Sequence, residues 1–162
     1  MNAPEPPARC CRRAAVSITS LMTGTAYRRS AELAGVVGPY AGFAKNKAGH
    51  ERIMGKHEAA SHQIRSASEI DVAVIEAANE QWALNTMIGE ANGWRNAQAS
   101  LLAPTGTIGF MMDCDTTGIE PDFSLVKYKK LSTGGSMQIA NQTIPFALDR
   151  LGYSQETVEA IV

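Results

Sequence analysis

The sequence predicts an α/β protein that is rich in helices. A long segment with helical periodicity, Ser68–Asn92, leads into a short apolar run, Asn96–Ala103. A helix that feeds a short apolar strand is the αβ connection of a parallel sheet. A tight loop of small residues follows at Thr105-Gly106-Thr107, and a second apolar run starts at Ile108. This order predicts a strand, a tight loop and a short helix.

Length and composition fit one globular domain. The chain has 162 residues, of which 44% are hydrophobic, and its net charge is -1. This charge gives no reason to expect a nucleic-acid or membrane-surface partner. No apolar run approaches the roughly 20 residues that span a bilayer. No apolar segment follows the basic N-terminal residues, so we expect no secretory signal and a cytoplasmic location.

The three cysteines do not form a recognisable framework. Cys10 and Cys11 are adjacent and Cys114 is distant, which is neither a disulfide pattern nor a zinc-ligand spacing. We therefore expect free reduced thiols. Radical or redox chemistry at Cys114 is the alternative.

The first elements are a lead-in and a helix. Residues 1–13 are rich in Pro and Arg and predict disorder. Ala14–Val37 predicts a helix that ends at Gly38-Pro39. The triplet Thr23-Gly24-Thr25 predicts close packing against another helix. The expected buried stripe has the i, i+3, i+4 pattern and consists of Ile18, Leu21, Met22, Thr25 and Ala26.

A second, more exposed helix is predicted over Gly42–Ser66. It contains the three histidines, His50, His57 and His62, of which the first two fall near one face. No cysteine or carboxylate completes a ligand set with them. We therefore expect surface histidines and no metal site.

The helix Ser68–Asn92 has the strongest local signals. Ser68 is a favourable N-cap, and Glu69 and Asp71 place negative charge in the first turn. Asn92-Gly93 predicts its end. Its apolar stripe consists of Val74, Ile75, Ala78 and Trp82.

The loop between the predicted strand and the short helix is the main candidate site. Thr105 and Thr107 supply hydroxyl groups, and Gly106 lets a ligand approach the backbone. N–H groups in the first turn of the following helix favour an anion. The Gly-Lys-Ser/Thr of an NTPase P-loop is absent. The residues alone support phosphate binding and an ordinary tight turn equally.

The acidic turn after this loop is expected to be structural. Its carboxylates match no EF-hand or paired-carboxylate spacing, and they are Asp113, Asp115, Glu120 and Asp122. Thr116-Thr117-Gly118 is expected to shape the same turn.

Strand and helix signals complete the chain. Ile119–Leu131 predicts an extended segment with lysines at 127, 129 and 130, which we expect to be a solvated strand end. Neutralisation of a nucleotide is the alternative role for these lysines. Ser132–Ser136 predicts a turn. A helix is predicted from Thr143 to Gly152, and Ser154 begins another.

One long segment carries a family resemblance. NAQASLLAPTGTIGFMMDCDTTGIEPDFSLVKYKKL resembles the part of the class II, adenosylcobalamin-dependent ribonucleotide reductases that includes their substrate-phosphate loop. The match continues through SLMTGTAYRRSAELAGVVGPYAGFAKNK and NQTIPFALDRLGY, so it covers roughly residues 14–162 and fails in residues 1–13. The resemblance implies that residues 14–162 are part of a ten-stranded α/β barrel domain. It also implies that the ribonucleotide phosphates are held by Ala103, Pro104, Thr105, Gly106, Thr107 and Ile108.

The radical cysteine of that family is missing from this chain. The family places it in an Asn-x-Cys-x-Glu loop, whereas Cys114 lies in Met-Asp-Cys-Asp. We therefore expect a fragment that positions substrate and is inactive alone. For the whole enzyme the resemblance implies adenosylcobalamin, with no contact residue assignable here, and a thioredoxin-like electron donor. The alternative is a non-catalytic, stand-alone nucleotide-binding module of the same fold.

Overall fold

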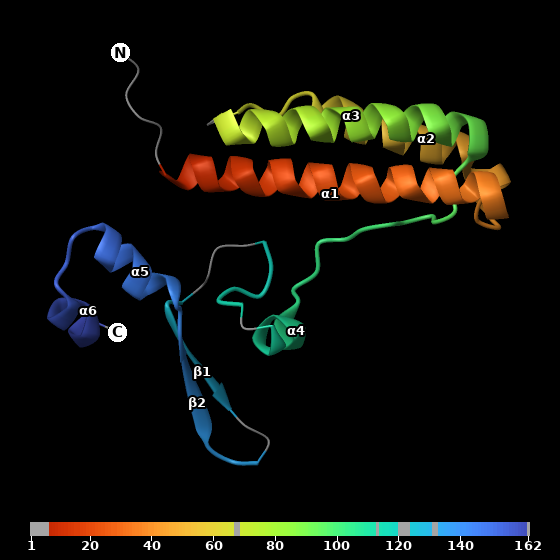
Figure 1. Ribbon diagram of the computed structural model, residues 1–162. Helices are drawn as coiled ribbons and strands as arrows, with labels where there is room; N and C mark the ends of the chain where they lie inside the picture. Colours follow the sequence, from red (N-terminus) through yellow and green to blue (C-terminus); the bar gives the residue numbers. More distant parts are fainter. Residues whose placement is uncertain (1–6, 67–68, 113, 120–123, 131–132, 162) are drawn as a thin grey trace. The chain divides into compact units, whose positions relative to one another are not determined.

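The computed structural model describes residues 7–66, 69–112, 114–119, 124–130 and 133–161. The chain divides into two compact units, Met1–Leu101 and Leu102–Val162, which we call the helical unit and the loop–hairpin unit. The helical unit contains three helices, which are α1 (Pro7–Val37), α2 (Phe43–Ser61) and α3 (Glu69–Asn92). In Figure 1 the long helices α1 and α3 lie side by side.

Helix α1 begins earlier than the composition suggested. Its first residue is Pro7, so the prediction of a disordered lead-in is wrong for residues 7–13, while residues 1–6 lie outside the described part. Proline is tolerated in the first turn because its missing N–H would have no partner there anyway. Nη1 of Arg13 donates a hydrogen bond to the carbonyl oxygen of Ser66 at 3.1 Å, which ties this end of α1 to the segment after α2.

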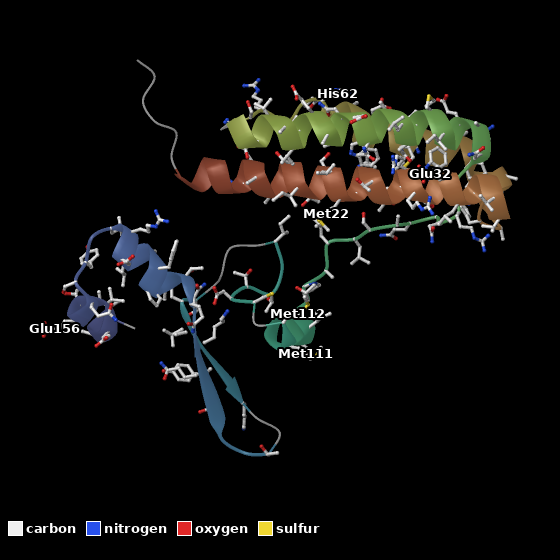
Figure 2. All side chains as sticks on the ribbon, viewed as in Figure 1. Met22, Glu32, His62, Met111, Met112 and Glu156 are labelled. Atoms are coloured by element: carbon white, nitrogen blue, oxygen red, sulfur yellow. The ribbon has the colours of Figure 1, made fainter. Side chains whose placement is uncertain are left out.

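The buried face of α1 differs from the predicted apolar stripe. Ile18 and Met22 are 53% and 68% exposed, and Figure 2 shows Met22 on the side of α1 away from α3. The buried positions instead carry mostly small side chains, namely Ser17, Gly24, Tyr27, Ser30, Ala31 and Ala34. A Cβ on Gly24 would lie 3.1 Å from the Trp82 indole. The prediction of close helix packing at this glycine is therefore confirmed, and close packing explains why larger side chains face outward.

Aromatic residues from all three helices and the segment after α3 form the core. The cluster consists of Tyr27, Ala31, Phe43, Met54, Trp82 and Trp94. The predicted stripe of α3 is confirmed, because Ile75, Ala78 and Trp82 are buried and Val74 is half-buried.

A chain of side-chain hydrogen bonds links the three helices beside this core. Nε1 of Trp82 donates to Oγ of Ser20 at 3.1 Å, and Ser20 donates to Oγ of Ser61 at 3.0 Å. Ser61 then donates to Oδ1 of Asn79 at 2.8 Å. The Trp82 indole N–H and the hydroxyls of Ser20 and Ser61 therefore all have partners, which removes the penalty of burying them alone.

Trp94 fills a space that a glycine of α3 leaves open. As predicted, α3 ends at Asn92, and Gly93 has a left-handed φ of +72°. The Trp94 ring then lies so close to Gly89 that a Cβ there would be 1.9 Å from it. Nε1 of Trp94 donates to Oδ1 of Asn85 at 2.6 Å. The Trp94 carbonyl accepts the N–H of Tyr40 at 2.9 Å, so Trp94 also fixes the α1–α2 connection.

The segment after Trp94 is extended, but the predicted strand Asn96–Ala103 is wrong. The N–H of Arg95 donates to the Ser30 carbonyl at 3.0 Å, and Ser100 donates to the Thr23 hydroxyl at 3.2 Å. The segment therefore runs back along α1. A strand requires a hydrogen-bonded neighbour, and no described strand pairs with this segment.

The loop–hairpin unit contains the short elements of the chain. They are α4 (Gly106–Met111), β1 (Val126–Lys130), β2 (Ser136–Ala140), α5 (Thr143–Arg150) and α6 (Gln155–Ile161). The strands pair antiparallel from Val126↔Ala140 to Lys130↔Ser136. Among the described residues this is the whole sheet, so the predicted parallel sheet is not found.

The hairpin confirms part of the predicted extended segment. β1 lies within Ile119–Leu131, whereas residues 120–123 and 131–132 lie outside the described part. The predicted turn is present at residues 133–135, where Gly134 and Gly135 have left-handed φ values of +89° and +94°. The return strand β2 was not predicted.

The C-terminal helices begin near their predicted positions. α5 starts at Thr143 as expected, and the N–H of Thr143 donates to Oδ1 of Asn141 at 2.9 Å. Oγ of Ser154 accepts the N–H of Thr157 at 3.3 Å, which confirms Ser154 as the start of α6. The predicted cap of α3, Ser68, lies outside the described residues.

We expect Gly89→Ala to destabilise the helical unit by about 1–3 kcal/mol or more, because the new methyl group overlaps the Trp94 ring. Urea denaturation followed by tryptophan fluorescence measures this directly, since both tryptophans of the chain lie in this unit. Gly55→Ala is the matched control, because a Cβ on that α2 glycine meets nothing within 4 Å. The control should be neutral or more stable by up to about 1 kcal/mol. Equal stability of the two variants would contradict the role given to Gly89.

Candidate functional site

The candidate phosphate loop, Ala103–Ile108, is exposed and opens a helix as predicted. α4 begins at Gly106, so its first three N–H groups have no acceptor within the helix. The N–H of Gly109 donates to the Thr105 carbonyl at 2.8 Å and closes the first turn. A Cβ on Gly106 would meet nothing within 4 Å, so the backbone is open to a ligand there.

Thr105 holds an unusual backbone conformation. Its φ of +46° makes it the one non-glycine residue with a positive φ among the described residues. A left-handed conformation costs an L-residue about 1–2 kcal/mol. Such strain persists only where the surroundings impose it, and it is concentrated at functional sites.

The acidic turn after α4 packs against this loop. A Cβ on Gly118, where φ is +148°, would lie 3.2 Å from the Ala103 carbonyl oxygen and 3.9 Å from Oγ1 of Thr105. On α4, a Cβ on Gly109 would be 3.5 Å from the Thr116 carbonyl oxygen. The segment Thr116–Gly118 therefore supports the loop from one side.

Asp115 and Lys127 attach this turn to the hairpin. Oδ1 of Asp115 accepts the N–H of Gln142 at 2.7 Å, which confirms a structural role for this carboxylate. Nζ of Lys127 donates to the Asp115 carbonyl at 2.6 Å, and Lys127 is only 8% exposed. The prediction of a solvated strand end is therefore wrong for Lys127, because its stem is buried by the turn, although Lys130 is exposed. The other acidic residues of the turn, Asp113, Glu120 and Asp122, lie outside the described residues.

Sulfur atoms are exposed at the end of α4. Cys114 is a free, exposed thiol, as predicted, and its Sγ lies 3.8 Å from the Met112 carbonyl. Met111 and Met112, which Figure 2 labels, are exposed as well. The side chains of Cys10 and Cys11 are not among the described ones.

The prediction of surface histidines is wrong for His50. It is 9% exposed, and its ring centroid lies 4.6 Å from that of Trp94. The Tyr40 hydroxyl lies 3.3 Å from its Nδ1. Burial lowers the pKa of His50, and the Glu51 carboxylate partly opposes this shift. His57 is exposed with its ring stacked on Trp82, and His62 is exposed, as Figure 2 shows.

A cavity of about 520 Å³ lies beside His50 in the helical unit. Its lining comes from α1, α2, the loop between them and the segment after α3, and consists of Tyr27, Tyr40, Lys45, Asn46, Gly49, His50, Ile53, Met54 and Ala97. The sequence indicated neither the burial of His50 nor this cavity, because both depend on how the helices pack. The spacing of Asn46, Gly49, His50 and Ile53 on one helical face is the signal that could have indicated it.

Two further classes of site are absent from the described ranges. None of their helices combines the length and hydrophobicity that crossing a membrane requires. No group of three or more His, Cys, Asp or Glu side chains within those ranges could hold a metal ion.

Comparison with known proteins decides the family. Residues 8–162 match the family model described as "Ribonucleotide reductase, barrel domain". The chain belongs to this ribonucleotide reductase family. The match starts at residue 8, so the resemblance extends further towards the N-terminus than the predicted boundary at Ala14. This correction agrees with the start of helix α1 at Pro7.

The similar reductases are much longer than this chain. A "Vitamin B12-dependent ribonucleotide reductase" of Streptantibioticus cattleyicolor is 60% identical over 151 residues, which are 93% of this chain and 25% of that protein. Reductases of the same name from Streptomyces avermitilis and Rhodopirellula baltica are 58% and 51% identical, over 93% and 90% of this chain and 16% and 14% of theirs. The chain thus spans a quarter or less of the length of these relatives.

We expect the free energy of unfolding of the helical unit to fall as the pH is lowered below about 6.5. The pKa of His50 lies below its ordinary value of about 6.5 when folded, so the unfolded chain gains a proton first. This contribution to stability is complete above the unfolded pKa and is lost as the pH falls through the folded pKa. Urea denaturation by tryptophan fluorescence at pH 7.5 and 5.0 measures the loss. Most of this loss of unfolding free energy should disappear in the variant His50→Phe and remain in the control His62→Gln. If His50→Phe loses as much stability as the unaltered chain, His50 is not the cause of the pH dependence.

We expect Gly118→Ala to change the conformation of the candidate loop. The added methyl group presses on the Ala103 carbonyl, so the amide NMR signals of Thr105 and Gly106 should shift. Gly134→Ala is the matched control, because it also places a side chain at positive φ, at a cost of about 1 kcal/mol, but meets nothing within 4 Å. If the amide signals of Thr105 and Gly106 are the same in Gly118→Ala and in Gly134→Ala, the turn at Gly118 does not support the loop.

Proposed function

We propose that this chain is the part of a vitamin B12-dependent ribonucleotide reductase that grips the substrate phosphates. The observation that carries the proposal is the exposed loop Ala103–Ile108 at the start of α4, in a chain 60% identical to a reductase of that name. In the whole enzyme we expect a ten-stranded α/β barrel, to which this chain contributes a few strands and their helices.

The residues of the loop suit a phosphate group. The hydroxyls of Thr105 and Thr107 are donors, and the first N–H groups of α4 add further donors with the positive end of a short helix dipole. The space around Gly106 lets a phosphate oxygen approach the backbone. Hydrogen bonds to a charged group are the strong ones, so a few donors suffice.

Phosphate binding would serve the reaction by positioning. Fixing the phosphates fixes the ribose relative to the radical cysteine that the whole enzyme supplies. In such a reaction a displacement of about 1 Å can cost about 10²-fold in rate. We therefore assign substrate positioning, and no proton or electron transfer, to the loop.

No contact with the cobalamin cofactor is assigned to a residue of this chain. Adenosylcobalamin would be the radical source of the whole reductase, and a thioredoxin-like protein would reset its cysteines. Cys114, the described thiol, lacks the Asn and Glu neighbours of a radical cysteine and lies near the Met112 carbonyl at an exposed turn. No reaction step through the cofactor is assigned to this chain, and alone it should not reduce ribonucleotides.

A stand-alone, non-catalytic nucleotide-binding module is the second candidate. The helical unit favours it, because Trp82 and Trp94 are buried in an aromatic core of its own. Such a module should be monodisperse, unfold cooperatively and bind a nucleoside diphosphate. A fragment that needs the rest of the barrel should aggregate or remain partly unfolded.

We expect the double variant Thr105→Val, Thr107→Val to bind a nucleoside diphosphate at least about tenfold more weakly, because two charge-assisted hydrogen bonds are lost. NMR titration of the chain with ADP measures the affinity and locates the site by the amide signals of α4. Thr133→Val, at an exposed position of the hairpin turn, is the control and should bind as the unaltered chain does. Unchanged affinity in the double variant would favour an ordinary tight turn.

A further inference from the structure

We propose that the cavity along α2, beside Gly49 and His50, binds a small organic acid: a carboxylate or phosphate group attached to a ring-sized carbon body. This site lies in the helical unit and is independent of the phosphate loop in the loop–hairpin unit. Four features support it, namely an open groove, an unpartnered donor, a positive environment and an apolar wall.

A glycine opens the groove on one face of α2. The residues that line it from this helix recur at the i, i+3, i+4, i+7, i+8 spacing, and they are Asn46, Gly49, His50, Ile53 and Met54. A Cβ on Gly49 would meet nothing within 4 Å, so any other residue there would project a side chain into free space. The cavity of about 520 Å³ is within the range of small-ligand sites and far larger than a bare ion needs.

His50 supplies a hydrogen-bonding atom that lacks a partner. Its Nε2 is buried and makes no hydrogen bond within the described part of the chain. The Tyr40 hydroxyl, 3.3 Å from Nδ1, can donate to that atom, and the neutral ring then carries its proton on Nε2. A buried N–H without an acceptor is costly, so a ligand oxygen that reaches Nε2 through a small movement of the His50 ring is favoured.

The surroundings of the groove favour a negative charge. Lys45 and Asn46 line it from the first turns of α2, where the helix dipole is positive. The first turn of α2 contains no acidic residue. Its N-cap residue is Gly42, and no side chain makes a capping hydrogen bond there. The nearby carboxylate of Glu51 lies 3.7 Å from the Lys47 ammonium, which offsets its charge.

Apolar surface on the other walls suits a carbon body. The buried rings and chains of Tyr27 and Met54 line the groove, and Ile53 borders it while 40% exposed. Aromatic rings pack well edge-to-face against such walls. An aromatic acid therefore matches both the donors and the apolar walls.

The test is an NMR titration of the ¹⁵N-labelled chain with benzoate and phenyl phosphate, and with benzyl alcohol as the neutral comparison. We expect the amides of Gly49 and His50 and the ring nitrogens of His50 to shift to saturation with both acids. The acids should bind about tenfold more tightly than the alcohol, because only they carry a negative charge that pairs with the Lys45 ammonium. If one acid alone binds, the carboxylate or phosphate is identified as the natural head group.

Two variants of α2 locate the site. Gly49→Leu should fill the groove and weaken binding of both acids by about tenfold or more. Gly55→Leu is the matched control, because that glycine is on the same helix with open space around it but does not line the cavity. Lys45→Met should weaken binding of the acids about tenfold and leave benzyl alcohol unaffected.

Several results would overturn the proposal. They are the absence of saturable shifts at Gly49 and His50, equal binding of benzyl alcohol, and unaltered binding to Gly49→Leu. Inorganic phosphate binding as tightly as phenyl phosphate would refute the carbon-body part. Any phenyl phosphate that binds the loop shifts Gly106 and Thr107 instead, so the two sites are read separately.

Discussion

The helical unit depends on the contact between the Trp94 indole and the space that Gly89 leaves on α3. Trp94 is completely buried, and its ring lies within 6 Å of the rings of Phe43 and His50, at 5.9 and 4.6 Å. Its carbonyl holds the N–H of Tyr40. One residue thus fixes the start of α2, the environment of the buried histidine and the exit of the chain towards the loop. A larger residue at position 89 would displace all three at once.

Local signals were sufficient to predict where α1 and α3 end, whereas α2 ends at Ser61 and not at the predicted Ser66. Gly38 and Gly93 both adopt left-handed φ values directly after α1 and α3, as the sequence suggested. The face that α1 buries could not be predicted in this way. Hydrophobicity favoured Ile18 and Met22, but the close approach of α3 at Gly24 requires small residues, and that requirement exists only once the helices pack.

Features of the site that depend on residues far apart in the chain could also not be predicted from the sequence. The loop and its helix were predictable because Pro104, Gly106 and the following apolar run lie next to one another. The burial of Lys127 was not predictable, because it depends on the turn that carries Asp115, twelve residues away, whose carbonyl accepts a hydrogen bond from the lysine. The burial of His50 depends on the ring of Trp94, which the fold brings from a different segment. The role of the loop in binding phosphate remains a proposal, supported by the family to which the chain belongs.

The extended segment 97–103 has a consequence for how the chain behaves beside other polypeptides. Within the described residues its backbone takes part in no backbone–backbone hydrogen bond, and Leu101 and Leu102 are exposed. Such a segment is a template for strand addition. A strand supplied in trans would satisfy these groups and cover the leucines. The chain is therefore suited to fragment complementation, in which its stability would depend on the concentration of a second polypeptide as well as on its own sequence.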